Sequence, residues 1–151
     1  MMQMNLQFPY KLLQAYTAYC RPLCQEIKLP QTAFDILMFL ANNPAHNTAR
    51  DIVEIRGIKA NLVSVNVDKL VHEGYIERAA VPGDRRKTYL TCTKKASPLI
   101  ERGRKIQAVF FQELLQTIDP DELNTFHRVF CAIDKNLDKM MKPASAKKKK
   151  K

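Results

Sequence analysis

Two adjacent arginines beside a turn are the residues whose type and spacing most directly indicate chemistry in this sequence. Arg85 and Arg86 follow Pro82-Gly83-Asp84, a combination that favours a tight turn. Guanidinium groups near the tip of a hairpin could enter a narrow A·T minor groove of duplex DNA, where negative potential is concentrated. Exposed charges on a turn are otherwise simply solvated, so their meaning depends on the elements that position them.

The positive charge of the chain is concentrated in the same region. The 151 residues carry a formal net charge of +10, and residues 147–151 are all lysine. Residues 47–104 hold twelve Lys or Arg against seven Asp or Glu, whereas 1–46 and 105–146 are close to neutral. A localised basic segment is typical of a protein that meets phosphates, although a solvated basic face would have the same composition.

The other reactive residues give no support for catalysis. His46, His72 and His127 are scattered, and there is no glycine-rich phosphate loop, no Cys-x-x-Cys pair and no nucleophile motif. Cys20 and Cys24 are spaced to share one helical face, which could serve a zinc pair or a redox switch. We expect no enzymatic activity, no cofactor and no metal site.

The compartment is indicated by what the sequence lacks. No apolar run approaches the roughly 18 residues of a membrane span, and no segment has the pattern of a secretion signal. The four cysteines are therefore expected to be reduced thiols of a cytoplasmic protein without membrane contacts.

Two helices are predicted before the basic region. Apolar side chains recur at steps of three and four over about 8–27, the period of one helical face, and Pro22 should kink this helix. The segment 31–42 is apolar almost all round, which predicts a helix buried on several sides.

A helix-turn-helix unit is predicted to follow. Thr48 and Asp51 can form a capping pair at the start of a short helix, which Gly57 should end after about two turns. The next helix spans about 60–73, and three of its apolar side chains should face inward: Val63, Val67 and Leu70. Two helices joined by a tight turn that contains glycine form such a unit.

The hydrophobic period then changes from that of a helix to that of a strand. Residues 75–80 and 87–92 are predicted as the strands of a hairpin whose turn spans 81–86. Its inward candidates are Ile76, Leu90 and Cys92. Because a helix-turn-helix followed by a hairpin wing is a module that reads duplex DNA, we predict a mainly α fold with a small β-hairpin wing.

Two more helices are predicted after the wing. Thr93 should cap a helix that runs to about 117, and residues 119–122 combine an acidic cap, an early proline and acids in the first turn of the next. That last helix carries an apolar stripe that an isolated chain would expose. We call it the apolar stripe: Leu123, Phe126, Phe130, Ile133 and Leu137. Residues 143–151 are expected to be a disordered lysine-rich tail, which either solubilises the chain or adds salt-sensitive attraction to DNA.

The chain resembles the MarR (multiple-antibiotic-resistance regulator) family of bacterial transcription factors. The resemblance covers nearly the whole chain apart from the lysine tail, and implies a single domain over 1–142 with a winged helix at about 31–93. Its most specific stretch runs from Leu70 to Thr93. The matching segments are Gly74, Tyr75-Ile76-Glu77-Arg78, Pro82-Gly83-Asp84-Arg85-Arg86, Arg21-Pro22-Leu23 and Leu29-Pro30-Gln31.

The resemblance implies a homodimer whose two winged lobes occupy successive stretches of a palindromic operator in double-stranded DNA. The helices at about 8–27 and 94–141 would interleave between the subunits, with Leu12 and the apolar stripe of the last helix among the contacts. The stripe supports this independently, because it exceeds what a compact lobe needs to cover. It could instead pack within its own chain.

The resemblance implies that the helix at 60–73 lies in the major groove and that the wing lies beside it. Arg85 or Arg86 would enter the minor groove, and Asp84 would hold an arginine or the wing backbone in place. Groove and base contacts are expected from the outward side chains Ala60, Asn61, Ser64, Val65, Asp68 and Lys69. Phosphate contacts are expected from Thr48, Lys59, Lys69 and Lys87. Asn61 could instead only cap its helix. Relatives often carry a basic residue near Val65, so strong guanine readout is in doubt here.

The family also suggests how such a protein is controlled. Relatives commonly bind small aromatic acids in a crevice between the dimerisation helices and the lobe; here the candidates, which could equally be core residues, are Tyr16, Tyr19, Phe34 and Phe110. Some relatives sense oxidants through a cysteine of the first helix, but Cys20 and Cys24 lie later in it.

The resemblance therefore favours a sequence-specific DNA-binding transcriptional regulator, most often a repressor released by a small aromatic effector or by thiol oxidation. Two other interpretations stay open: a winged-helix protein–protein adaptor, and a nonspecific architectural DNA binder.

Overall fold

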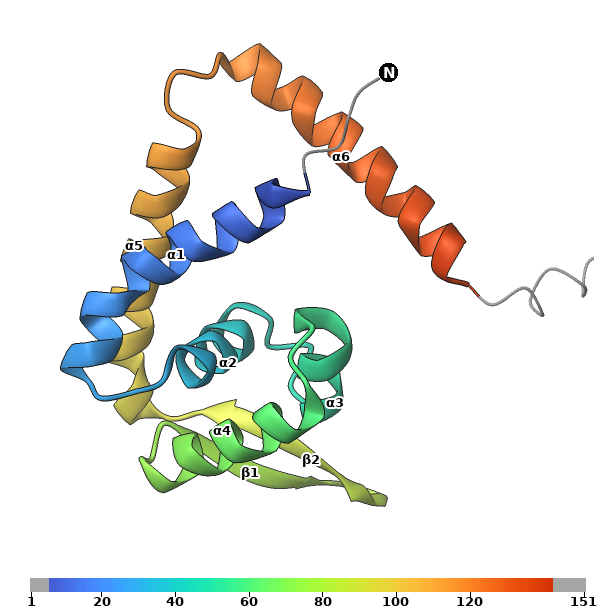
Figure 1. Cartoon of the computed structure of the whole chain (residues 1–151). Coiled ribbons are helices and arrows are strands. Elements are labelled where there is room, and N and C mark those ends of the chain that lie inside the picture. Colours follow the sequence, from blue (N-terminus) through green and yellow to red (C-terminus); the bar gives the residue numbers. More distant parts are fainter. Residues whose placement is uncertain (1–5, 143–151) are drawn as a thin grey trace, which may run out of the picture. The chain divides into compact units, whose positions relative to one another are not determined.

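A computed structural model describes residues 6–142, and these form helices and a single hairpin (Figure 1). The lysine tail expected at 143–151 lies outside the described residues. In chain order the elements are α1 (Gln7–Glu26), α2 (Gln31–Asn42), α3 (Ala49–Asp51), η1 (Ile52–Arg56), α4 (Ala60–His72), β1 (Ile76–Val81), β2 (Asp84–Cys92), η2 (Lys94–Ala96), α5 (Ser97–Leu114) and α6 (Pro120–Met141). The predicted class, mainly helical with a hairpin wing, is confirmed.

The chain divides into two compact units, residues 1–111 and 112–151, and the division falls near the end of α5. The first unit contains the winged-helix lobe and α1. The second contains α6. No helix among residues 6–142 has the length and apolar character needed to cross a membrane.

The centre of the first unit is α2. Phe34, Ile36 and Leu37 are fully buried in it, as the all-round apolar sequence predicts. Helices α1 and α4, the π-helical segment η1 and strand β2 all contact α2. Burying such side chains contributes roughly 1.5–3 kcal/mol each, so α2 is the surface on which the other elements are placed.

The helix-turn-helix begins with the predicted cap. The Asp51 amide donates to Thr48 Oγ1 (3.1 Å), and the Thr48 amide donates to Asp51 Oδ2 (3.1 Å). The helix then widens into η1, a π-helix, instead of continuing as the α-helix expected from the sequence. Gly57 ends it at φ 75°, a left-handed conformation that costs glycine little. The chain thereby turns into α4.

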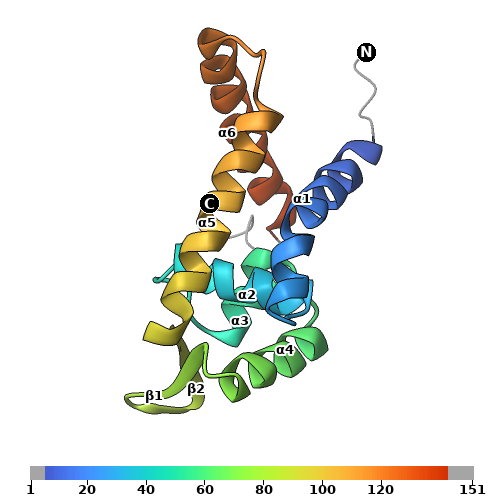
Figure 2. The ribbon, with the colours of Figure 1, turned by 90° about the vertical axis from the view of Figure 1, so that its left-hand side faces the viewer.

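The wing is longer and its turn is tighter than predicted. Strands β1 and β2 are antiparallel, from the pair Ile76–Cys92 to the pair Val81–Asp84. Only Pro82 and Gly83 lie between them, so the turn predicted over 81–86 is wrong. Proline fixes φ at the first position and Gly83 has φ 82° at the second, so two residues reverse the chain. The residues that follow Gly83 therefore belong to β2, and the hairpin lies beside α4 (Figures 1 and 2).

The connection after the wing also differs from the prediction. Thr93 makes no side-chain cap to the following helix; its Oγ1 donates to the Gly74 carbonyl instead (2.6 Å). A 3-10 turn, η2, intervenes before α5 begins at Ser97. Because its hydroxyl is used at the end of α4, Thr93 ties the wing to that helix rather than starting α5. Helix α5 ends at Leu114, before Thr117, whose φ of 67° is left-handed.

Helix α5 approaches α2 closely at a glycine. Gly103 is buried, and a Cβ built on it would lie 2.5 Å from Met38 Sδ and 3.0 Å from Phe34 Cζ. Polar contacts hold the same approach, since Arg104 Nη2 donates to the Ala41 carbonyl (3.1 Å). The lack of a side chain at Gly103 thus sets the spacing of these two helices.

A valine at this position should overfill that contact. We expect Gly103→Val to lower the free energy of unfolding by about 2 kcal/mol, because three added carbons meet the packed side chains of α2. Ala108→Val, on an exposed position of the same helix, is the matched control and should change stability by less than about 0.5 kcal/mol. Equal effects of both substitutions in urea unfolding would contradict the close approach.

Candidate nucleic-acid interface

A groove of about 990 Å³ lies between the helix-turn-helix and the wing. Six of the residues predicted to contact DNA line it: Thr48, Ala60, Ser64, Asp84, Arg86 and Lys87. They come from α4, from β2 and from Thr48, the N-cap residue of α3, and α4 and the hairpin form two walls of the groove. The fold therefore brings these distant parts of the sequence to one surface.

Helix α4 presents a polar face outward and an apolar face inward. Val63, Val67 and Leu70 are buried, as predicted. The residues expected to face outward are exposed, apart from half-buried Lys69: Ala60, Asn61, Ser64, Val65 and Asp68. Val65 is 66% exposed, so it is an apolar side chain that the lobe leaves uncovered. Such a face can offer both hydrogen bonds and an apolar contact to base edges.

The wing carries three consecutive cations that form no ion pair with another described residue. Arg85, Arg86 and Lys87 are exposed, and within residues 6–142 no ion pair engages them. Arg86 and Lys87 line the groove, whereas Arg85 does not. Asp84 Oδ1 accepts a hydrogen bond from the Arg86 amide (2.9 Å), so this carboxylate fixes the wing backbone.

Two arginines of the groove were missed by the sequence analysis. Arg78 on β1 forms an ion pair with Asp68 on α4 and so connects the wing to the helix. Its position could have been found, because two-residue alternation places it on the same face as inward Ile76. Arg50 also lines the groove and pairs with Glu54 (2.7 Å).

The cations near the ends of α4 have different surroundings. Lys59 is the exposed N-cap residue of α4. Lys69, near the C-terminal end, is half-buried, lies 3.6 Å from Glu73, and lines a separate hollow of about 450 Å³ with Arg21 and Lys28. Lys69 is therefore not part of the groove, and its contact with phosphate stays a prediction. Asp51 also lines the groove between the helix-turn-helix and the wing. Hydrogen bonds from the side chain and backbone of Thr48 lower the pKa of its carboxyl group.

The aromatic residues suggested for an effector mostly pack on one another. Phe34 is fully buried in the core. Tyr16 and Tyr19 meet Phe110 edge to face, with centroids 5.4 and 5.3 Å apart. The Tyr16 hydroxyl accepts a hydrogen bond from Gln107 Nε2 (2.9 Å), and burial raises the pKa of this hydroxyl. Ligand binding by these four aromatic residues stays a prediction.

The cysteines of α1 lie inside the protein. Cys20 is fully buried and Cys24 is 8% exposed. Burial raises the pKa of both thiols, that of Cys24 to about 11. A thiol that stays protonated is a poor nucleophile and a poor metal ligand. Residues 6–142 contain no group of three or more side chains suited to hold a metal ion.

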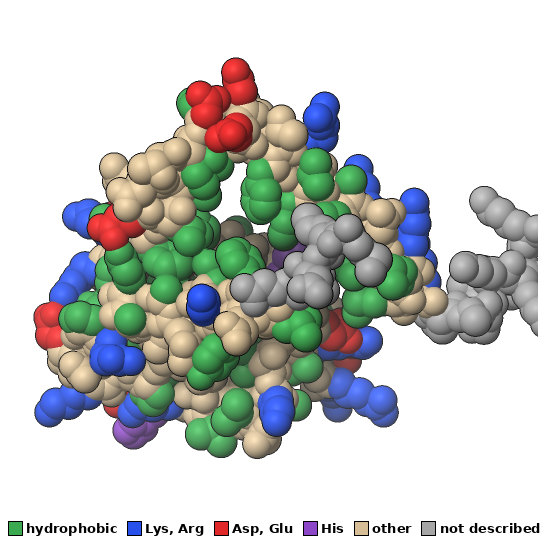
Figure 3. Space-filling view, turned by 45° about the horizontal axis from the view of Figure 1, so that its top comes forward, with side chains coloured by type: hydrophobic (Ala, Val, Ile, Leu, Met, Phe, Trp, Pro, Cys, Tyr) green, Lys and Arg blue, Asp and Glu red, His purple; other side chains and the backbone are tan. Residues whose placement is uncertain are grey.

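The apolar residues predicted for dimerisation are largely uncovered. No described residue of α6 is buried, and its hydrophobic side chains are visible in Figure 3, with Lys and Arg side chains along one edge. Phe126 and Phe130 of the apolar stripe are 61% and 56% exposed, whereas Leu123 is half-buried. On α1, Leu12 is half-buried, while Phe8 and Leu13 are exposed.

These elements define a winged helix-turn-helix protein: a capped turn, an exposed second helix and a basic hairpin beside it. The family model of the MarR family matches residues 27–87, which include the whole helix-turn-helix and most of the wing. Over its winged-helix lobe the chain is therefore similar to the MarR family of transcription regulators.

Solved structures of transcriptional regulators share the fold. The transcriptional regulator PA3341 is 27% identical, with a TM-score of 0.71 over 87% of this chain and 98% of that one. A MarR transcriptional regulator from Methanosarcina mazei is 20% identical, with a TM-score of 0.73 over 87% and 94% of the two chains. A MarR family regulator from Listeria monocytogenes, solved with a 26mer DNA, is 17% identical, with a TM-score of 0.79 over 90% of each chain.

The burial of the α1 cysteines predicts slow thiol chemistry. At a given pH the native Cys24 should have roughly one hundredth of the thiolate of a free cysteine, because its pKa is raised from 9.0 to about 11. Iodoacetamide should therefore modify Cys20 and Cys24 far more slowly in the folded protein than in urea, as peptide mass spectrometry would record. Labelling of either residue at the rate of the unfolded chain would contradict this account.

Proposed function

We propose that this protein is a homodimer of the MarR family that binds a palindromic operator in double-stranded DNA and represses transcription until an effector releases it. The observation that carries the proposal is the groove, in which an uncovered helix face and unpaired cations share one surface. The Listeria monocytogenes relative solved with DNA supports duplex DNA as the ligand. A repressor of this kind would act in the cytoplasm.

In this proposal α4 enters the major groove and the wing follows the adjacent minor groove. Asn61 and Ser64 are exposed near the start of α4 and can donate and accept at base edges. Arg85 or Arg86 would enter the minor groove, and Thr48, Lys59 and Lys87 would contact phosphates. The Arg78–Asp68 ion pair holds the wing on α4, so that both elements meet the duplex as one body.

Dimerisation follows from the apolar surface that each unit leaves uncovered. The apolar stripe exposes adjacent large side chains, with Ile133 49% and Leu137 48% exposed. In a solvated monomer such a surface is unfavourable, and a second copy would bury it about a twofold axis. Two lobes would then read half-sites about one helical turn apart.

Control by a small molecule would act through an aromatic cluster between α1 and α5. The cluster of Tyr16, Tyr19 and Phe110 joins α1 to α5 and offers aromatic edges to a small aromatic acid. Release by oxidation of Cys20 or Cys24 would first require local opening, because both thiols are buried.

Loss of the wing arginines should weaken DNA binding without unfolding the lobe. We expect Arg85→Ala and Arg86→Ala each to reduce affinity about tenfold for a duplex that the wild-type protein selects from a random pool. Lys105→Ala, an exposed cation on α5 outside the groove, is the control and should change affinity less than about twofold. Fluorescence anisotropy at fixed salt measures all three.

The same titrations separate the competing functions. Asn61→Ala and Ser64→Ala should reduce the preference for the selected duplex over a scrambled one. Equal affinity of the wild-type protein for both duplexes would identify a nonspecific architectural binder, and absence of measurable DNA binding would favour a protein–protein adaptor.

A charge within the apolar stripe should separate the subunits. We expect Phe130→Asp to convert a dimer into a monomer in sedimentation equilibrium, because a carboxylate would otherwise be buried without a partner. Asn124→Asp adds the same charge at an exposed position on the opposite face of α6 and should leave the dimer intact. A wild-type protein that is monomeric at micromolar concentration would contradict the proposed assembly.

A further inference from the structure

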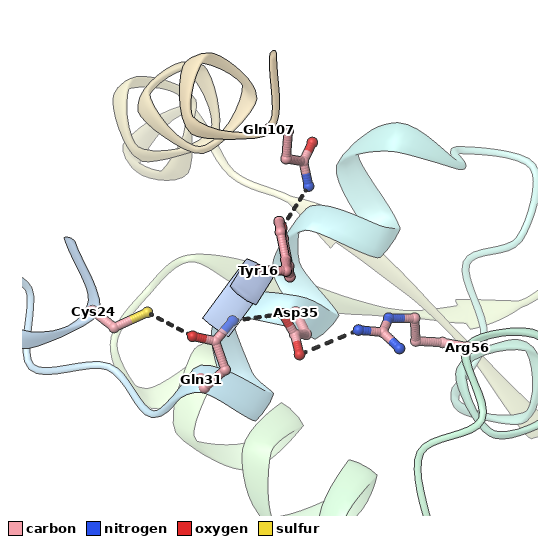
Figure 4. A network of polar contacts seen from close by, with 6 residues as sticks. All are labelled: Tyr16, Cys24, Gln31, Asp35, Arg56 and Gln107. Carbon is pink, nitrogen blue, oxygen red and sulfur yellow. Dashed lines mark hydrogen bonds and ion pairs between the residues drawn. The ribbon is translucent and has the colours of Figure 1, made fainter. Parts of the chain in front are cut away.

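A line of polar side chains crosses the core of the lobe from α1 to the helix-turn-helix (Figure 4). Cys24 Sγ lies 3.7 Å from Gln31 Oε1, and Gln31 Nε2 donates to Asp35 Oδ1 (2.9 Å). The other carboxylate oxygen, Asp35 Oδ2, accepts from Arg56 Nη2 (3.3 Å). Both oxygens of Asp35 are therefore engaged, one by an amide and one by a guanidinium.

Asp35 lies in surroundings that disfavour its charge. Its side chain is 16% exposed, and burial raises the pKa of the carboxyl group even though Gln31 and Arg56 act in the opposite direction. The titratable groups that face it are Tyr16 and the two cysteines of α1, which gain no charge near neutral pH because burial raises their pKa values too. Arg56 supplies the only compensating charge on Asp35 among the described residues.

The ionised carboxylate consequently does not stabilise the fold. A carboxyl group whose pKa is raised by folding binds more protons in the native state, so stability falls as pH rises through the raised value. At neutral pH an amide in place of Asp35 would avoid this desolvation and still accept the bond from Gln31. The same substitution would remove the negative charge that pairs with Arg56.

Arg56 occupies the position from which α4 is directed. It is the last residue of η1, and Gly57 follows it in a left-handed conformation. Two residues after Gly57, Lys59 is the N-cap residue of α4, whose first turns carry the exposed Asn61 and Ser64. The ion pair thus fixes the start of this connection to α2, while the Arg56 side chain is only 34% exposed.

We propose that Asp35 and Arg56 are positioning residues for DNA recognition: their ion pair holds η1 and the Gly57 turn on α2, and so sets the position of α4 without contacting DNA. The inference rests on the proposed function. A recognition surface that is loose by about 1 Å loses its contacts, so breaking the pair should weaken selective binding while the fold remains.

The test compares Asp35→Asn, Arg56→Gln and the double variant in the full-length protein. The probes are a duplex enriched from a random pool by the wild-type protein and a scrambled duplex of the same composition. The matched control is Glu26→Gln, which breaks an exposed ion pair to Arg102 between α1 and α5 (3.0 and 2.5 Å). Thermal unfolding of every variant is recorded in parallel.

We expect Asp35→Asn and Arg56→Gln each to reduce affinity for the enriched duplex about tenfold, and the double variant to lose little more than either single one, because both remove the same contact. Affinity for the scrambled duplex should change less than about twofold, since phosphate contacts supply it. The melting temperature of Asp35→Asn should equal or exceed that of the wild type, and the Glu26→Gln control should bind normally.

Other outcomes would overturn the proposal. Unchanged selectivity of Asp35→Asn, additive losses in the double variant, or parallel losses of stability and affinity would show that the pair does not position α4. A loss confined to Arg56→Gln and equal for both duplexes would show a direct phosphate contact instead. Failure of the proposed function itself would be visible earlier, since the wild-type protein would enrich no sequence.

Discussion

The burial of α2 on all sides is the interaction on which the rest of the structure depends. Phe34, Ile36 and Leu37 are inaccessible to solvent, and the elements that flank α2 are held by covering them. Interiors of this kind are packed closely and transmit small shifts. Because α4 and β2 both contact this helix, a displacement of α2 would move the candidate interface.

The polar contacts of the lobe fix directions that this burial leaves open. The ion pair of Arg78 and Asp68 sets the wing against α4, and that of Arg56 and Asp35 sets the start of α4 against α2. Neither pair lies wholly in the core, and exposed pairs add little stability. Their consequence is geometric: they determine where the uncovered face of α4 and the free wing arginines lie relative to one another.

The sequence was sufficient to predict most elements, because each has its own local signal. The Thr48–Asp51 cap, the inward face of α4 and the buried α2 depend on neighbouring residues, and all three were found. The use of the Thr93 hydroxyl depends on the Gly74 carbonyl 19 residues away and was missed, as was the π-helical η1. The turn at Pro82-Gly83 has a local signal in those two residues, but it was predicted too wide. The position of Arg78 could have been read from strand alternation, whereas the Asp35–Arg56 pair joins residues 21 apart on different helices and left no periodic trace.

Methylation protection of the bound duplex tests the central claim most directly, because dimethyl sulfate modifies guanine N7 in the major groove and adenine N3 in the minor groove. On a duplex enriched by this protein, we expect protected guanines within each half-site and protected adenines in the flanking A·T minor groove. Protection in neither groove, with the protein bound at saturation, would contradict the placement of α4 and the wing on DNA.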